Sequence, residues 1–365
     1  MFSLPGPNLG TRVLRGHVEE PPHDVRATPW IKEFGAEAVS CSRVSVDHDR
    51  LARVTGPVML IDSAGLWFRG YFALPDSLTA PDGTPVNAVR GFCDMLAKLV
   101  TDRRPDRLVA CLDNDWRPQF RVDALPSYKA HRVAEEDPDA EEVPDTLSPQ
   151  IPIVLDLLDA LGVTTAEAEG FEADDVIGTL AHRERRAPVE VVTGDRDLFQ
   201  LVRDAPTTTR VLYVGAGLAK LQNFGPAELA EKYALVRGRA GDAYAEMAIL
   251  RGDPSDGLPG VAGIGEKTAA KLISEFGSLP ALLEAAELDT RRITPKARAN
   301  LLASKDYLAV APSVVEVVRD APVVLDRDDD ATPSVPADPD RVAQLRDRWG
   351  LGGTVDRLMH ALARS

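Results

Sequence analysis

The segment EADDVIGTLA, residues 172–181, opens an apolar pattern of helical spacing with three acids, and the segment VEVVTGDRD, residues 189–197, ends a β-branched run with two more. Two further short apolar runs lie upstream, at residues 58–61 and 108–112. Short apolar runs that alternate with helical segments are typical of a parallel sheet covered by helices on both faces. The sequence therefore predicts an α/β fold with a mainly parallel sheet flanked by helices.

Acidic residues stand where these three runs end, at Asp62, Asp113 and Asp195. In an open α/β sheet the carboxyl ends of the strands lie along one edge, where ligands bind, so we expect the three side chains to meet there. The helix that begins near residue 172 adds three more acids: Glu172, Asp174 and Asp175. Acids in a helix's first turn are also favoured by the helix dipole, so any one of them could serve only as a cap.

Carboxylates packed together repel one another unless cations neutralise them, and all-oxygen ligation suits Mg²⁺ or Mn²⁺. Zinc is disfavoured, because the chain has six His and three Cys without a Cys-x-x-Cys or His-Glu-x-x-His pattern. The acids therefore predict a divalent-metal site.

A glycine-rich segment at residues 252–269 supplies a second feature. Its glycines form a predicted tight turn that opens onto a helix at residues 266–276, so backbone N–H groups and a helix N-terminus face an anion together. The spacing is not that of a Walker loop and favours a helix-hairpin-helix clamp on a DNA phosphate. A plain connection between two helices is the alternative. The predicted DNA-binding residues are Gly260, Gly263, Gly265, Lys267, Thr268 and Lys271.

Five blocks in fixed order, at residues 60–62, 128–132, 171–175, 193–198 and 252–261, resemble the bacterial 5'-3' exonucleases of the flap endonuclease family, which include the exonuclease domain of DNA polymerase I. The resemblance runs from about residue 58 to about residue 325. It implies a PIN-like core, a helical arch that clamps the 5' single strand, and a helix-hairpin-helix-type module. It also implies a potassium ion (K⁺) bound by hairpin carbonyls.

The resemblance assigns metal ligands residue by residue. A first metal site takes Asp62, Asp113, Glu172, Asp174 and Asp175, and a second takes Asp195, Asp197, Asp253 and Asp256, with Asp195 between the two. At the base of the arch it assigns Tyr128, Lys129 and Arg132, with Arg121 upstream, to catalysis, and it implies that Lys129 and Arg132 contact the scissile phosphate. The spacing between Asp113 and Phe120 departs from the family pattern, so Asp115 is a rival ligand.

Four regions are predicted: an extension at residues 1–55, a catalytic core at 56–240 with the arch at about 117–150, a DNA-binding region at 241–320, and a C-terminal segment at 321–365 that packs on the body. The extension is expected to be weakly ordered or to arise from an upstream start codon. Seven acids in residues 135–145 form either a solvated loop or a gate that excludes DNA. Within the core, we expect a helix from near Thr84 and a hairpin of residues 209–214 and 218–222.

The net charge of −15 argues against a polyanionic partner, but much of it lies in the predicted metal site, the arch and residues 326–330. The local potential with metal bound is therefore the relevant quantity. No signal peptide or membrane span is evident, and the cysteines read as reduced residues of a cytoplasmic protein. We expect a monomer without a membrane partner.

These features predict a divalent-metal-dependent 5'-3' exonuclease and structure-specific 5' flap endonuclease. We expect it to stand alone without a polymerase module, to use two or more ions, and to act in DNA replication and repair, including Okazaki fragment processing. Its expected substrates are DNA with 5' flaps, nicks or 5' ends, including RNA-primed ends. Two alternatives stay open: a DNA-structure-binding protein of the same fold without catalysis, and a PIN-type ribonuclease, which would leave the glycine-rich clamp unexplained.

Overall fold

The computed structural model describes residues 11–13, 56–134, 141–288 and 291–364 of the 365-residue chain. The prediction that residues 1–55 are weakly ordered lies outside the described residues, apart from the short strand β1 (Thr11–Val13). Cys41 lies outside them as well, whereas Cys93 and Cys111 are buried free thiols.

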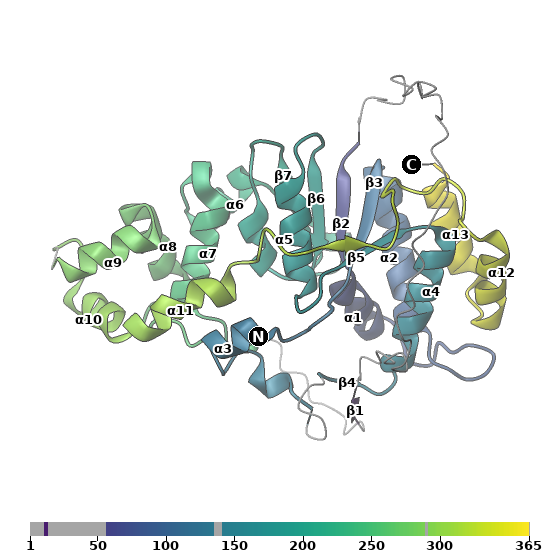
Figure 1. Ribbon diagram of the computed structural model, residues 1–365, viewed down its shortest axis with the longest axis horizontal. Helices are drawn as coiled ribbons and strands as arrows, with labels where there is room; N and C mark the ends of the chain where they lie inside the picture. The colour runs from purple at the N-terminus through teal and green to yellow at the C-terminus, as the bar shows by residue number, and fades with distance from the viewer. Residues whose placement is uncertain (1–10, 14–55, 135–140, 289–290, 365) are drawn as a thin grey trace, which may run out of the picture.

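A seven-stranded sheet forms the centre of the molecule, in the order β8-β7-β6-β2-β3-β5-β9 (Figure 1). Its five inner strands are parallel, and the two edge strands run antiparallel to their neighbours. The predicted mainly parallel sheet is confirmed. The strands are β2 (Val58–Asp62), β3 (Arg107–Cys111), β5 (Thr164–Glu167), β6 (Val189–Thr193), β7 (Thr209–Tyr213), β8 (Gln222–Phe224) and β9 (Val324–Leu325).

The strand side chains divide between two hydrophobic cores. In β2, Val58 and Leu60 belong to one core and Met59 and Ile61 to the other, as the two-residue repeat of a strand requires. On the first face lie helices α5 (Ala173–Arg183), α6 (Pro226–Tyr233) and α7 (Ala240–Arg251). On the second lie α1 (Ser63–Ala73), α2 (Asn87–Arg103) and α4 (Ile151–Leu161). The sheet is therefore buried on both sides.

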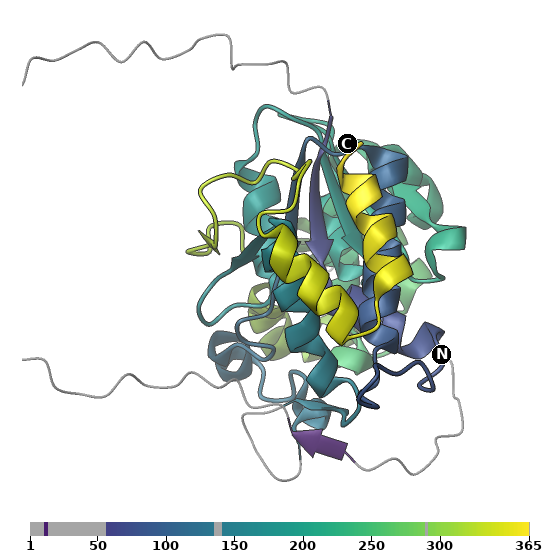
Figure 2. The same cartoon turned by 90° about the vertical axis from the view of Figure 1, so that its right-hand side faces the viewer.

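The C-terminal helices pack against the sheet domain. Helices α12 (Pro339–Arg348) and α13 (Gly352–Leu362) add Val342, Leu345, Val355 and Leu358 to the core that contains α2 and α4. Figure 2 shows this pair lying across the end of the molecule. No helix in the described part of the chain is both long and apolar enough to span a membrane.

A helical lobe projects from the other end of the molecule (Figure 1). It contains α8 (Glu266–Phe276), α9 (Leu279–Glu287), α10 (Pro295–Ala303) and α11 (Lys305–Val315). The predicted bounds of α8 agree with the structure. Its buried residues, Ala269, Ala270, Leu272 and Ile273, belong to the same core as α7, so the lobe is continuous with the sheet domain.

Two predicted boundaries are wrong. Helix α2 begins at Asn87 rather than near Thr84, because Thr84 and Leu78 accept backbone bonds that close a turn before the helix. The predicted hairpin does form, but its second strand is 222–224, since residues 218–220 make a 3₁₀ turn, η5 (Leu218–Lys220), after Gly217.

The arch segment differs from a long helical arch. Its described part holds one short α-helix, α3 (Gln119–Ala124), the 3₁₀ turns η2 (Ala130–Arg132) and η3 (Ser148–Gln150), and strand β4 (Glu142–Pro144), which pairs with β1. Prolines at 126 and 144 and the dense run of acids disfavour a longer helix. The acidic stretch at residues 135–140 lies outside the described residues.

Candidate active site

The carboxyl ends of β2, β3 and β6 meet at one edge of the sheet, as the sequence predicts. Asp62 ends β2 and caps α1, where its carboxylate accepts hydrogen bonds from the Gly65 N–H at 2.8 Å and the Thr193 hydroxyl at 2.7 Å. A Cβ on residue 65 would lie 2.3 Å from the Asp62 carboxylate, so only glycine fits there. Asp62 is thereby fixed in place between two strand ends.

Two strand-end aspartates compete for the role given to Asp113. The Asp113 carboxylate accepts a hydrogen bond from the Ala173 N–H at 2.7 Å, which ties the end of β3 to the start of α5. Asp115 instead accepts a bond from the Arg117 N–H two residues later, at 2.9 Å, and closes its own turn. The geometry favours Asp113, because Asp113 lines the cavity described next and Asp115 does not.

A cavity of about 310 Å³ opens at this edge. Five of the nine predicted metal ligands line it, together with two predicted catalytic cations. These residues are Asp62, Asp113, Glu172, Asp174, Asp195, Lys129 and Arg132. We call this space the carboxylate cavity. It brings together residues from the ends of three strands, the first turn of α5 and the base of the arch segment.

Burial and mutual repulsion raise the proton affinity of these carboxyl groups. Asp113 keeps an exposed surface, yet the protein packed around its carboxylate removes hydration and raises its pKa to about 7. Lost hydration, with the charge of Asp195 as a further cause, also raises the pKa of Asp62 and of Asp174. A bound cation would lower these pKa values, because it would offset both causes.

Glu172 joins the arch base to the start of α5. Its carboxylate accepts hydrogen bonds from the Tyr128 hydroxyl at 2.8 Å and from Arg121 at 2.5 Å, and it pairs with the Lys129 ammonium. Lys129 has a left-handed backbone (φ 48°) and donates its own N–H to the Asp256 carbonyl at 3.0 Å. Lys129 and Arg132 both line the carboxylate cavity.

Arg121 and Asp175 do not lie where the resemblance places them. Their side chains are 2% and 0% exposed and form a bidentate pair, with both N···O distances 2.7 Å. The Val318 N–H donates to the same carboxylate, and Val314 accepts a bond from the guanidinium. Neither residue lines the carboxylate cavity. The structure therefore shows them as a buried pair that fixes α3 and residues 314–318 against α5.

The remaining predicted ligands form a second group beside the cavity. Burial, followed by the charges of Asp195, Asp256 and Asp253, raises the pKa of Asp197, so each of these three carboxylates lies near Asp197. Of the four, only Asp195 lines the cavity. Arg132 donates to the Asp256 carboxylate at 2.8 Å and to the Ser255 carbonyl at 2.8 Å, which fixes the arch base to the segment after α7.

Sequence reasoning gave no site role to Arg69, Trp116 and Glu141, which line the cavity, or to Thr193, which bonds Asp62. The Arg69 guanidinium donates to the Gly215 carbonyl at 3.1 Å. A helical signal was available, because Arg69 stands seven residues after Asp62 and so lies on the same face of α1, two turns on. Thr193 precedes the Gly194-Asp195 turn and orients Asp62 through its hydroxyl.

The predicted clamp lies between α7 and α8. Gly252 and Gly260 both have positive φ, and their backbones approach so closely that a Cβ on either would lie 2.5 Å from main-chain atoms. Gly265 caps α8, and a Cβ there would meet open space. The side chains of Lys267, Thr268 and Lys271 are exposed on the following turns, and Gly263 also has positive φ. The loop thus presents a helix N-terminus and two cations to solvent.

The donor chemistry of the carboxylate cavity fits a hard divalent cation, because its acidic oxygens lie together and carry raised pKa values. Across the described residues, no three His, Cys, Asp or Glu side chains are arranged as a ready ligand set. Hydrogen bonds from Lys129, Gly65, Thr193 and Ala173 hold several of the carboxylates in their present places.

Comparison with known proteins identifies the family to which the chain belongs. The chain is 57% identical over 310 residues to a 5'-3' exonuclease of Mycobacterium tuberculosis, covering 84% of this chain and 98% of that one. The chain belongs to the 5'-3' exonuclease family. It is therefore a nuclease, a phosphodiester hydrolase. Family models match in two parts, the N-terminal resolvase-like domain at residues 57–234 and the C-terminal SAM fold at residues 240–338.

Other members of this exonuclease family are similar over the same region. A 5'-3' exonuclease of Streptomyces coelicolor is 55% identical, with 83% of this chain and 99% of that one covered. DNA polymerase I of M. tuberculosis is 38% identical over 85% of this chain, which corresponds to 32% of the polymerase. The predicted resemblance, including the exonuclease domain of DNA polymerase I, is confirmed.

Solved structures share the fold at low identity. The bacteriophage T5 D15 flap endonuclease, in a pseudo-enzyme-product complex with DNA and metal ions, gives a TM-score of 0.54 at 18% identity over 84% of this chain and 98% of that one. The catalytic core of Rad2 with DNA substrate gives 0.51 at 18% identity over 85% and 93%. These structures confirm the predicted PIN-like fold class of the exonuclease.

Proposed function

We propose that the exonuclease hydrolyses DNA from 5' ends and cuts 5' flaps, with divalent cations held in the carboxylate cavity. The observation that carries this proposal is the convergence of Asp62, Asp113 and Asp174 with Lys129 and Arg132 on one cavity. Carboxylates suit the cations, and the two basic side chains suit a phosphate. The T5 D15 endonuclease is named as a complex with DNA and metal ions, which supports the same pairing here.

The residues that would hold Mg²⁺ or Mn²⁺ are the cavity carboxylates Asp62, Asp113, Glu172, Asp174 and Asp195, with Asp197, Asp253 and Asp256 beside them. Such ions supply a hydroxide nucleophile at neutral pH and charge stabilisation at the leaving oxygen. Asp175 is left out of this proposed set of ligands, because its carboxylate is already paired with Arg121 within the core.

Lys129 and Arg132 would bind the scissile phosphate from the arch side. In the structure they pair with Glu172 and Asp256, so they are held at the cavity by the same acids that the cations would neutralise. A positioned cation lowers the barrier by stabilising charge that develops on the phosphate. The clamp at Gly265 and Lys267 would hold duplex DNA by its backbone, without reading its sequence. The same proposal includes the binding of K⁺ at that loop.

Cleavage assays on three substrates test the proposed function. A 5'-labelled flap, a nicked duplex and a single-stranded RNA are incubated with the purified full chain and Mg²⁺ or Mn²⁺. We expect cleavage of the two DNA substrates with 5'-phosphate products. Tight DNA binding without cleavage at any ion concentration would instead support the binding-protein alternative, and cleavage of RNA alone would support the ribonuclease alternative.

Removal of the arch cations is expected to slow chemistry more than it weakens binding. Lys129→Ala should lower the single-turnover rate on the flap by about 10²-fold, the typical effect of losing one positioned electrostatic contact. Arg132→Lys should retain only part of the wild-type rate. Its ammonium keeps the charge but cannot reproduce the planar guanidinium that bonds Ser255 and Asp256. If both variants bind poorly but cleave normally at saturating enzyme, the residues are anchors.

Loss of the clamp cation is expected to weaken binding to duplex of any sequence. Lys267→Ala should reduce the slope of log K against log salt by about one, because one phosphate contact is removed. Lys98→Ala is the matched control. Lys98 is also exposed, but it pairs with Asp102 on α2, the helix that packs on the other face of the sheet. Equal slopes for the wild type and the Lys267 variant would assign the loop a structural role only.

Metal binding is expected to strengthen as pH rises from about 5.5 to 8. Asp113 has a raised folded-state pKa of about 7, so its proton stabilises the metal-free fold fully below the unfolded pKa, and this contribution is lost as pH rises through 7. A cation must displace that proton. Differential scanning fluorimetry should therefore show a growing increase in Tm with Mn²⁺ across this range. A constant increase would separate Asp113 from the metal site.

A further inference from the structure

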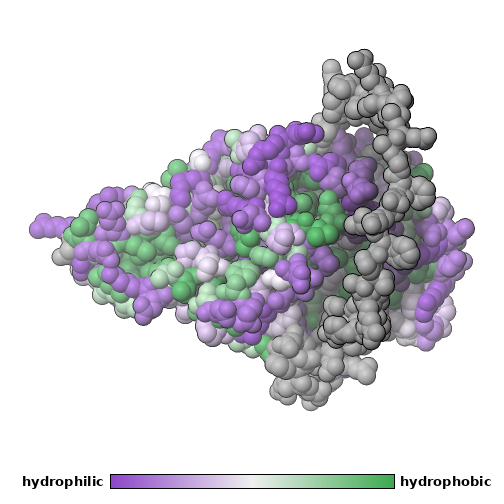
Figure 3. Space-filling view, viewed as in Figure 1, coloured by the Kyte–Doolittle hydropathy of each residue, from purple (hydrophilic) through white to green (hydrophobic). Residues whose placement is uncertain are grey.

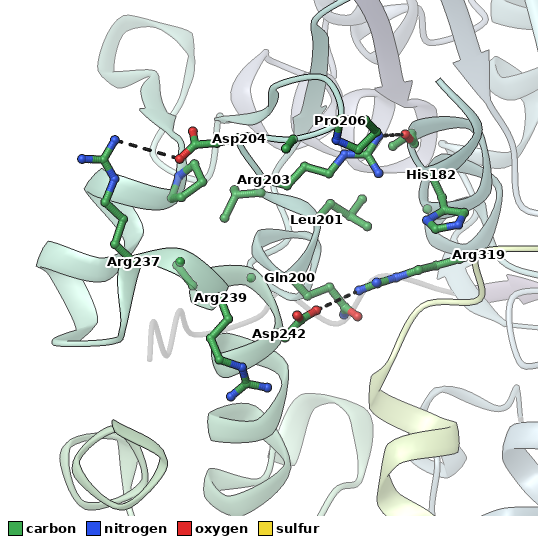
Figure 4. A pocket seen from close by; sticks show the side chains of 18 of the residues that line it. His182, Gln200, Leu201, Arg203, Asp204, Pro206, Arg237, Arg239, Asp242 and Arg319 are labelled. Carbon is green, nitrogen blue, oxygen red and sulfur yellow. Dashed lines mark hydrogen bonds and ion pairs between the residues drawn. The ribbon is translucent and has the colours of Figure 1, made fainter. Parts of the chain in front are cut away.

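A second cavity, of about 490 Å³, lies at the opposite edge of the sheet from the carboxylate cavity. Its walls are the C-terminal half of α5, the 3₁₀ turn η4 (Asp197–Leu201) with the loop that leads into β7, and the first turn of α7 (Figure 4). Along α5 the carboxylate cavity is lined by Ala173 and Asp174 and the second cavity by Gly178, Ala181 and His182, so the two linings are about one helical turn apart and share no residue. The second cavity is therefore separate from the proposed cleavage site.

Positive charge dominates this second cavity. Five arginines and two aspartates line it, in a chain whose net charge is −15. Each of the two aspartates forms an ion pair with a cavity arginine: Asp242 with Arg319 at 3.4 Å and Asp204 with Arg237 at 3.9 Å. Arg239 points away from the cavity and pairs with Glu246 on α7 (Figure 4). Arg185 and Arg203 carry the remaining charge, and we call the space the arginine cavity.

The guanidinium groups of Arg185 and Arg203 have only main-chain carbonyls as hydrogen-bond partners among the described residues. Arg203 donates to the Ala181 and Glu184 carbonyls at the end of α5, and Arg185 donates to the His182 and Glu184 carbonyls. The Nε of Arg203 is buried and has no hydrogen-bond partner in the described part of the chain. Mutual repulsion is evident, because burial and the nearby Arg185 and Arg319 lower the pKa of Arg203. Carbonyls cannot neutralise this charge.

The shape and lining of the cavity restrict the anion that it fits. No Phe, Tyr or Trp lies among the lining residues, so the cavity lacks the large aromatic side chains on which nucleobases commonly stack. Guanidinium groups match the oxygens of a phosphate through paired N–H donors. The proline rings at 206 and 226 and the side chain of Leu201 form an apolar part of the wall. The lining thus favours a compact oxyanion.

We propose that the arginine cavity is a phosphate-binding site, separate from the carboxylate cavity, in which Arg185, Arg203 and Arg319 contact the bound group. The phosphate could be free inorganic phosphate, or it could belong to a DNA strand that passes this edge. Both sources offer the same oxygens. The site is independent of the catalytic proposal, because none of its lining residues lines the carboxylate cavity.

Binding of inorganic phosphate to the full chain, measured by isothermal titration calorimetry at constant ionic strength, tests this proposal. Arg185→Gln and Arg203→Gln should each weaken binding by about tenfold or more, as expected for loss of one charge-assisted hydrogen bond. Arg186→Gln is the matched control, because Arg186 is the next exposed residue but does not line the cavity. Arg203 also caps α5, so the exposed Arg185 provides a variant that leaves that cap intact.

A second probe, a 5'-phosphorylated DNA duplex followed by fluorescence anisotropy, separates the two sources. Weaker phosphate binding by the Arg185 variant with unchanged DNA affinity assigns the site to free phosphate. Lower DNA affinity in that variant, with the Arg186 variant unchanged, assigns it to a DNA backbone phosphate. If the Arg185, Arg203 and Arg186 variants behave alike toward both probes, or if the wild type binds neither, the proposal is overturned. Cleavage of the flap by the Arg185 variant should match that of the wild type.

Discussion

Asp174→Asn is expected to reduce flap cleavage by about 10³-fold, the upper range for losing one preorganised electrostatic group at an active site. The side chain lines the carboxylate cavity, and its raised pKa shows that it is packed against other acids. Asparagine keeps the size of the side chain and removes the charge that would hold a cation. Single-turnover rates at saturating enzyme, measured over a range of Mg²⁺ and Mn²⁺ concentrations, give the effect.

The control for this variant is Asp115→Asn. Asp115 also follows β3 within the same acidic region, but its carboxylate closes a local turn with Arg117 and lies outside the cavity. We expect its cleavage rate to stay near that of the wild type. Asp174→Asn should also raise the Tm of the metal-free protein, because one repelling charge is removed, and should lose most of the Tm increase that Mn²⁺ gives the wild type. Normal cleavage by Asp174→Asn would remove Asp174 from the site.

The architecture of the exonuclease could be predicted because its signals are local. The β-branched runs at 58–61 and 189–192 are too short for helices and too apolar for loops, so their assignment as buried strands needs no tertiary information. The inner strand β5 and the edge strand β9 escaped this reasoning. Strand β9 has two exposed residues, Val324 and Leu325, and is defined only by its pairing with β5, so no pattern within it marks a strand.

The members of the site could be found from the sequence, but their division of labour could not. Asp174 and Asp175 are adjacent and chemically identical, and both open the same helix. Their side chains point about 100° apart around the helix, as successive residues must, so one faces the cavity and the other faces the core. The sequence does not say which, because the partner that decides it, Arg121, lies more than 50 residues away. Spacing within α5 therefore leaves the choice open.

The buried pair gives the second large effect, on stability rather than on chemistry. Asp175→Asn is expected to cost about 3–5 kcal/mol in the free energy of unfolding, because removal of one partner leaves the Arg121 charge buried without its bidentate carboxylate. Arg121→Met should cost a similar amount, since it leaves both Asp175 and Glu172 short of a donor. Urea denaturation of metal-free protein gives these values.

The double variant Arg121→Met/Asp175→Leu separates a structural pair from a metal ligand. Replacement of a buried ion pair by apolar side chains of similar size is often neutral or stabilising, so the double variant should be more stable than either single variant. Its cleavage should stay near that of the wild type, because every cavity carboxylate remains and Glu172 keeps its bonds from Tyr128 and Lys129. If Asp175 were instead a metal ligand, Asp175→Asn would keep its metal-free stability and lose its response to Mn²⁺, as Asp174→Asn should. A stable double variant that remains as inactive as Asp174→Asn would return Asp175 to the metal site.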